Sequence, residues 1–253
     1  LEVVLRWFGV QEGDEVIVPA YTYCATANVI VHCGAKPVMV DVNADDFDVC
    51  LEKVREAITD KTKVIMPVDL GGMPCAYDEL FELVEVKALF RAKTEEQGKL
   101  GRILILSDSA HSIGAEYKGR KAGSLADVSV FSFHAVKNLT TAEGGAIMLN
   151  LPEPFDNEEV YRYLCTYTLH GQNKDALAKT KKGAWRYDVL VSGFKGNMTD
   201  IMASIGLVEL SRYEDDTLHY RKCIYDQYTD AFSRYGWAEL PIYETEDRKS
   251  SYH

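Results

Sequence analysis

A lysine stands in the segment SFHAVKNLTTAEGGAI, residues 132–147, shortly after an apolar run that predicts a buried strand. Small and hydroxyl residues follow Lys137, which is typical of a loop at a strand end. A lysine that attacks a carbonyl must be partly neutral, and burial or nearby positive charge lowers its pKa. Most loop lysines are solvated surface residues, so a reactive Lys137 requires chemical partners nearby.

A carboxylate precedes this lysine in the chain, at the end of the apolar run RILILSDSA, residues 102–110. Ligands of α/β proteins bind at the carboxyl ends of parallel strands, where Asp108 is expected. An ionised carboxylate there is costly without a cationic partner. A protonated pyridine nitrogen is such a partner, and the pairing lets the ring accept electrons. The alternative is that Asp108 caps the turn after its strand.

The elements that position these two residues alternate between strands and helices. Apolar runs predict strands at 15–21, 36–42, 63–70, 102–110, 128–134 and 144–150, and helical periodicity predicts helices at 1–8, 22–33, 51–58 and 77–99. Residues 151–198 predict an irregular, extended surface segment, and residues 199–236 predict long helical structure. Alternating β and α units are typical of an α/β protein with a mostly parallel sheet.

Composition limits the partners and the compartment. The 253 residues include 39 acidic and 28 basic side chains, and the net charge of -11 repels nucleic-acid phosphates and anionic lipids. No apolar run is long enough to cross a membrane. Six scattered cysteines, without a C-x-x-C pair or a metal-like spacing, predict reduced and mostly buried thiols. We therefore expect a cytoplasmic protein that binds neither nucleic acid, membrane nor metal.

The segments SDSAH and SFHAVKNLTTAEGGAI resemble the aspartate and lysine motifs of the DegT/DnrJ/StrS sugar aminotransferases, which use pyridoxal 5'-phosphate (PLP) and have fold type I. Four further segments also resemble this family and occur along the chain in its usual order. They are GDEVIVPAYTYCATANVI, GAKPVMVDV, KVIMPV and GFKGNMTDIMASIGL. The lysine motif is specific, whereas the strand segments are individually weak. The resemblance implies a three-layer large domain over residues 1–225 and the start of a smaller C-terminal α/β domain over 226–253, with residues missing at both ends.

The resemblance also implies roles for individual residues around the cofactor. Lys137 holds PLP as a Schiff base and moves protons, and Asp108 pairs with the ring nitrogen. Tyr23 matches the aromatic residue that stacks on the ring, and His111 matches a residue near its phenolic oxygen. Without the resemblance, Tyr23 is equally well a core tyrosine and His111 a buried, hydrogen-bonded histidine.

Two further residues match positions that contact the cofactor phosphate. Ser132 matches a hydroxyl that binds the phosphate, although a serine at a strand end is commonly a turn former. Asn197 matches a residue that reaches the phosphate in the neighbouring subunit, which implies a homodimer with two chains at each active site.

Other features depart from the family or extend it. The glycine-threonine phosphate loop belongs just before Leu1 and is not in the sequence. Asp69 stands where relatives often have histidine, which predicts altered contacts near the sugar. A basic stretch is either solvated surface or a site for the diphosphate of the substrate. It comprises Lys179, Lys181, Lys182 and Arg186.

The function implied by the resemblance is a two-stage transamination, as in polysaccharide biosynthesis. An amino donor, L-glutamate in the family, leaves its nitrogen on the cofactor, and the keto sugar of a nucleotide-sugar receives it. One alternative is a PLP-dependent sugar dehydratase on the same scaffold, but such enzymes typically carry histidine at the lysine position. Another is a PLP-binding regulatory protein without turnover. The intact pair of Lys137 and Asp108 favours amination over both.

Overall fold

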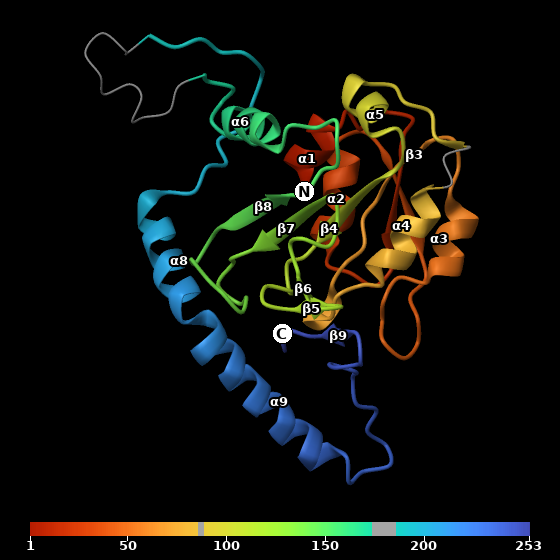
Figure 1. Ribbon diagram of the computed structural model, residues 1–253, viewed down its shortest axis with the longest axis vertical. Coiled ribbons are helices and arrows are strands. Elements are labelled where there is room, and N and C mark those ends of the chain that lie inside the picture. Colours follow the sequence, from red (N-terminus) through yellow and green to blue (C-terminus); the bar gives the residue numbers. More distant parts are fainter. Residues whose placement is uncertain (86–88, 174–185) are drawn as a thin grey trace.

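The computed structural model describes residues 1–85, 89–173 and 186–253. Its centre is a six-stranded sheet in the order β2-β1-β3-β4-β7-β8 (Figure 1). The first five strands in this order are parallel neighbours, and β8 runs antiparallel to β7. The structure therefore confirms the predicted α/β fold with a mostly parallel sheet.

Each strand of this sheet lies within or at one of the apolar runs that predicted a strand, although the ends of the strands differ from the predicted ends by a few residues. The strands are β1 Glu15–Pro19, β2 Lys36–Val40, β3 Thr62–Ile65, β4 Leu104–Asp108, β7 Val128–Ser132 and β8 Gly145–Leu149. Since β1, β3, β4 and β7 are parallel, their carboxyl ends meet at one edge of the sheet. Asp108 and Ser132 are the last residues of β4 and β7, so both lie at this edge.

Helices cover both faces of the sheet, because successive strand residues point to opposite sides. Ile105 packs in one core with helices α3 (Leu51–Ala57) and α4 (Tyr77–Glu85). Its neighbours Leu104 and Leu106 pack in the other core with four further helices. These are α1 Glu2–Trp7, α2 Cys24–His32, α5 Glu95–Leu100 and α6 Asn157–Tyr167. The three-layer arrangement follows directly from this alternation.

Two predictions about helices were wrong. The single helix expected at 77–99 is α4 followed by α5 (Glu95–Leu100), and residues 90–94 between them are not helical. A new helix begins at Glu95 because the Thr94 hydroxyl caps it by accepting a hydrogen bond from the Gln97 amide. The segment 151–198 was expected to be irregular, yet it contains α6, whose N-cap Asp156 accepts from the amides of Glu158 and Glu159.

The long helical structure predicted after residue 199 is confirmed. It consists of α8 (Asp200–Arg212), a π-helical turn η3 (Tyr213–Leu218) and α9 (His219–Phe232), which run along one side of the molecule (Figure 1). The chain then returns to the sheet domain, where β9 (Arg248–Lys249) joins β5 (Glu116–Tyr117) and β6 (Arg120–Lys121) in a small antiparallel sheet. The predicted domain boundary after residue 225 falls inside α9, and the division into two domains stays a prediction.

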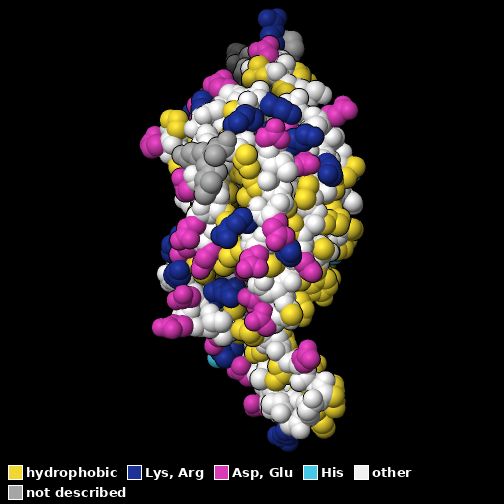
Figure 2. Space-filling model, turned by 90° about the vertical axis from the view of Figure 1, so that its right-hand side faces the viewer, with side chains coloured by type: hydrophobic (Ala, Val, Ile, Leu, Met, Phe, Trp, Pro, Cys, Tyr) yellow, Lys and Arg dark blue, Asp and Glu magenta, His cyan; other side chains and the backbone are white. Residues whose placement is uncertain are grey.

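The charged side chains of both signs are mixed on the surface. Lys and Arg side chains are interspersed with Asp and Glu over the face shown in Figure 2.

All six cysteines are free, but only Cys33 and Cys75 are buried, so the prediction of mostly buried thiols was wrong. Within the described ranges, no helix is both long and apolar enough to span a bilayer. The same ranges hold no cluster of His, Cys, Asp and Glu suited to a metal ion.

Candidate active site

A cavity of about 560 Å³ opens at the carboxyl ends of the parallel strands. Five of the six residues predicted for the site line it, namely Tyr23, Asp108, His111, Ser132 and Lys137. Val68, Leu70 and Val130 contribute apolar wall between these polar groups. Polar groups that converge in a mainly apolar cavity are typical of a site for a small organic ligand.

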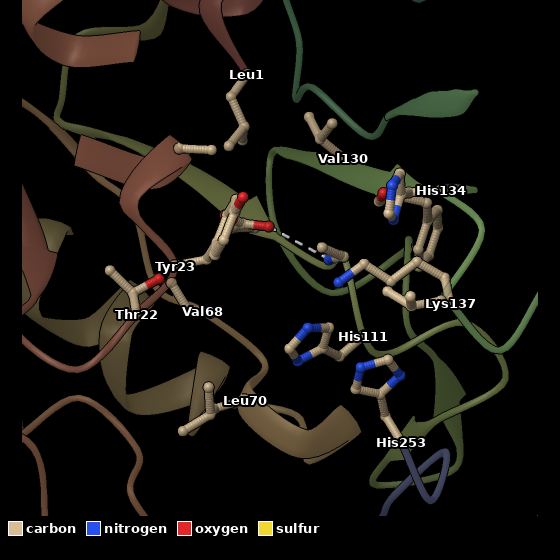
Figure 3. Close-up of a pocket in the computed structure, with 16 residues that line it drawn as sticks. Leu1, Thr22, Tyr23, Val68, Leu70, His111, Val130, His134, Lys137 and His253 are labelled. Carbon is tan, nitrogen blue, oxygen red and sulfur yellow. Dashed lines mark hydrogen bonds between the residues drawn. The ribbon is translucent and has the colours of Figure 1, made fainter. Parts of the chain in front are cut away.

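Lys137 reaches into this cavity from the turn that follows β7 (Figure 3). Its backbone N–H donates to the His134 carbonyl at 2.9 Å, which closes the turn and fixes the starting point of the side chain. Partial burial lowers the pKa of the Lys137 amine, and the nearby carboxylate of Asp108 opposes this shift. A larger fraction of the amine is therefore neutral, as attack on a carbonyl requires.

Asp108 lines the cavity and is only 8% exposed. Its Oδ2 accepts a hydrogen bond of 2.8 Å from the Thr26 hydroxyl, and its Oδ1 accepts one of 3.3 Å from the Ala110 amide. Burial raises the pKa of Asp108, whereas these two donors and the charge of Lys137 lower it. The carboxylate is thus oriented before any ligand arrives, and each of the two reactive groups acts on the pKa of the other.

Thr26 is a site residue that sequence reasoning missed. It is fully buried in the first turn of α2, and its hydroxyl also lies 2.8 Å from that of Thr22. The available signal was its spacing from Thr22, because residues four apart lie on one face of the helix predicted at 22–33. This spacing indicates that the two hydroxyl groups lie close together, as they do, but not that Thr26 meets a carboxylate.

Tyr23 and His111 approach the cavity from different elements. Tyr23 is the N-cap residue of α2, and its side chain is 75% exposed beside the cavity. The ring of His111 stacks on that of His253, with centroids 3.9 Å apart (Figure 3). Burial, together with the charges of His253 and Lys137, lowers the pKa of His111 to about 3, so the imidazole is neutral.

His111 also provides a direct indication that the cavity suits a polar ligand. Its Nδ1 is buried, and no hydrogen-bond partner for it occurs among the residues that the structure describes. An unpaired buried nitrogen is costly, so a ligand oxygen at this place would satisfy it. His134 and His253 line the same cavity and were not predicted.

The two residues predicted for the phosphate lie in different places. Ser132 lines the cavity, and its Oγ accepts a hydrogen bond of 3.4 Å from the His134 amide. Asn197 is exposed and does not line the cavity; its side chain contacts the Lys195 amine and the Met198 carbonyl. A role for Asn197 at the site of a neighbouring subunit stays a prediction.

Asp69, at the position where the sequence predicts altered contacts near the sugar, does not line the cavity. Its side chain is 1% exposed and turns away from the cavity into a cluster of hydroxyl groups. Only its neighbours Val68 and Leu70 line the cavity. The physical reason is that these donors satisfy the carboxylate inside the protein. Of the basic stretch, Arg186 is exposed, and Lys179, Lys181 and Lys182 lie outside the described residues.

Comparisons with known proteins agree with the geometry. Spr1654 from Streptococcus pneumoniae, named as a sugar aminotransferase, is 49% identical in its PMP form, with a TM-score of 0.92 over 100% of this chain and 63% of that chain. Its PLP form is 46% identical, with a TM-score of 0.90. The spore coat polysaccharide biosynthesis protein SpsC of Bacillus subtilis is 34% identical over 249 residues, which are 98% of this chain and 59% of that protein.

An uncharacterized protein of Methanocaldococcus jannaschii is 39% identical over 215 residues, or 85% of this chain and 50% of that protein. This chain therefore spans between half and two thirds of the length of these relatives. The model of the DegT/DnrJ/EryC1/StrS aminotransferase family matches residues 1–253. The resemblance of the aspartate and lysine motifs is thereby confirmed, and the chain belongs to the DegT/DnrJ/EryC1/StrS aminotransferase family.

Proposed function

We propose that this chain is part of a PLP-dependent aminotransferase that moves an amino group from an amino acid, L-glutamate, to the keto sugar of a nucleotide-sugar. The observation that carries the proposal is the placement of the Lys137 amine and the Asp108 carboxylate on one cavity, close enough for each to shift the pKa of the other. The PLP and PMP forms of Spr1654 and the polysaccharide role in the name of SpsC support it.

The residues around the cavity fit PLP in size and chemistry. Lys137 and Asp108 line the cavity. Lys137 would supply the amine that holds the aldehyde carbon, and Asp108 would supply the carboxylate for the ring nitrogen. Tyr23 offers an exposed aromatic face for stacking, and the unpaired Nδ1 of His111 offers a partner for the phenolic oxygen. Ser132 lines the same cavity and would supply a hydroxyl to the cofactor phosphate. When bound, PLP supplies an electron-accepting ring that stabilises negative charge at the carbon attached to the transferred nitrogen.

The protein side chains have separate tasks in this reaction. Asp108, ionised and held by Thr26, keeps the ring nitrogen protonated. With PLP bound, Lys137 would move a proton between the substrate carbon that bears the transferred nitrogen and C4′ of the cofactor. The apolar wall formed by Val68, Leu70 and Val130 excludes water from these groups. The neutral imidazole of His111 accepts or donates a single hydrogen bond without adding charge.

The wider organisation is also part of the proposal. The active form is a homodimer in which Asn197 of each chain reaches the cofactor phosphate of the other. Residues 1–225 form the PLP-binding domain, and residues 226–253 begin a smaller domain. The unpaired thiols agree with a cytoplasmic location.

The test uses the full-length protein with PLP, L-glutamate and a 4-keto sugar nucleotide. Formation of 2-oxoglutarate together with an amino sugar is the expected result. Borohydride reduction followed by peptide mass mapping should place the cofactor on Lys137, and Lys137→Ala is the control that abolishes both signals. Loss of a sugar hydroxyl without 2-oxoglutarate would identify a dehydratase instead. Cofactor binding without any turnover, joined to capture of a partner protein, would favour the regulatory alternative.

A further inference from the structure

Asp69 accepts hydrogen bonds from four donors although it is almost completely buried. A carboxylate has about four acceptor positions on its two oxygens, so this set occupies all of them. Burial raises the pKa of Asp69, whereas the donors oppose that shift. The cavity described above touches Val68 and Leu70 on either side of this residue but not Asp69 itself.

The two oxygens of Asp69 bind two different parts of the fold. Oδ1 accepts from the Tyr77 hydroxyl at 2.7 Å and from the Cys75 amide at 3.1 Å, at the start of α4. Oδ2 accepts from the Ser112 hydroxyl at 2.6 Å and from the Ser109 hydroxyl at 3.2 Å. The side chain therefore bridges a helix in one covering layer to the turn at the end of β4.

That turn carries the two groups assigned to the cofactor ring. Ser109 directly follows Asp108, and Ser112 directly follows His111. The backbone of Asp69 adds a further bond, because its N–H donates to the Asp108 carbonyl at 3.2 Å. One buried residue thus binds the backbone of Asp108, the residue directly after Asp108 and the residue directly after His111.

We propose that Asp69 is a positioning residue that fixes Asp108 and His111 relative to Lys137 by holding the 107–112 turn from behind. The inference rests on the proposed PLP chemistry and adds a residue that never touches the cofactor. Groups that act on a bound ring must be held in place by the packing and hydrogen bonds around them, and a displacement of about 1 Å lowers the rate on the order of 100-fold.

The experiment compares Asp69→Ala, Asp69→Asn and the control Asp14→Ala in the full-length enzyme with PLP. Asp14 is also fully buried and hydrogen-bonded, but it precedes β1 at the opposite edge of the sheet. Three quantities are measured: the melting temperature, kcat against KM, and the pH midpoint of the near-visible absorbance of the bound cofactor. The midpoint reports the groups around the ring and does not depend on turnover.

The expected result separates position from stability. Both alanine variants melt at lower temperature, but only Asp69→Ala shifts the pH midpoint and lowers kcat on the order of 100-fold. Asp69→Asn has a pH midpoint and a kcat between those of Asp69→Ala and the wild type, because its amide group still bridges the helix and the turn. A lower melting temperature with wild-type midpoint and kcat in Asp69→Ala would overturn the inference.

Two further outcomes remain distinct. If Asp69→Ala does not fold, Ser112→Ala removes a single bond to Oδ2 and is expected to shift the midpoint in the same direction by less; a wild-type midpoint there also overturns the inference. Wild-type protein that takes up no PLP would instead refute the proposed function, and it is recognised before any variant is compared.

Discussion

The Thr26 hydroxyl donates a hydrogen bond of 2.8 Å to Oδ2 of Asp108, across 82 positions of the chain. This contact joins the first turn of α2 to the end of β4 and leaves neither group exposed. A buried carboxylate that loses a donor becomes harder to ionise. The strength of the pairing between Asp108 and a pyridine nitrogen therefore depends on a residue outside both sequence motifs.

Replacing Thr26 with valine tests this dependence with little change in shape. The unfolding free energy should fall by about 1–3 kcal/mol, because Oδ2 of Asp108 is left buried without its donor. The affinity for PLP should fall as well, since the pKa of Asp108 rises. Denaturant titration and absorbance titration with PLP measure the two effects.

Thr62→Val is the matched control for this change. Thr62 is fully buried at the amino end of β3, and its hydroxyl accepts from the Thr59 amide at 2.9 Å. It should lose stability but keep wild-type affinity for PLP. Equal loss of affinity in both variants would mean that Thr26 acts only through general stability.

The depressed pKa of His111, about 3, predicts how stability responds to acid. The unfolded chain binds this proton near pH 6.5, whereas the folded protein resists it. Stability contributed by the neutral imidazole is present above pH 6.5 and is lost as the pH falls toward 3. His111→Gln should reduce this fall in the unfolding free energy at acid pH. Urea denaturation between pH 7 and pH 4 measures it, and an unchanged slope would show that His111 titrates normally.

Asp48 predicts the opposite pH dependence. It is 8% exposed, burial raises its pKa to about 6, and the nearby Asp46 adds to this while Arg248 opposes it. The folded protein holds this proton more tightly than the unfolded chain does. The contribution of Asp48 is therefore full below about pH 4 and is lost as the pH rises through 6. Asp48→Asn should remove this decline in urea denaturation between pH 4 and pH 7, whereas Asp41→Asn, at an exposed aspartate, should keep it.

The sheet and the location of the reactive pair could be predicted because each depends on local sequence. Apolar runs with polar ends define buried strands, and parallel strands bring Asp108 and the loop of Lys137 to the same edge. The break before α5 was readable in principle from Thr94, a capping residue followed by glutamates. Helix α6 was equally readable from Asp156 and the acidic residues that follow it.

Other features depend on contacts between distant segments and leave no local pattern. The strands Glu116–Tyr117 and Arg248–Lys249 are two residues long, too short for any periodicity to appear. The direction of Asp69 could not be predicted, because alternation along an irregular stretch does not decide which face a side chain takes. The carboxylate is buried because Ser109 and Ser112, which follow the distant strand β4, donate hydrogen bonds to it.

Mixing two inactive variants tests whether Asn197 serves the neighbouring subunit. Lys137→Ala removes the amine of its own site, and Asn197→Ala should weaken phosphate binding wherever Asn197 acts. If Asn197 acts across the interface, a mixed dimer has one site with both defects and one site with none. Random reassociation of equal amounts should then restore roughly a quarter of wild-type activity, since half of the dimers are mixed and each has one intact site. If Asn197 acts within its own chain, every site of the mixed dimer carries a defect, and activity stays at the level of the parent variants. Asn197 is exposed and does not line the cavity of its own chain, which favours restoration.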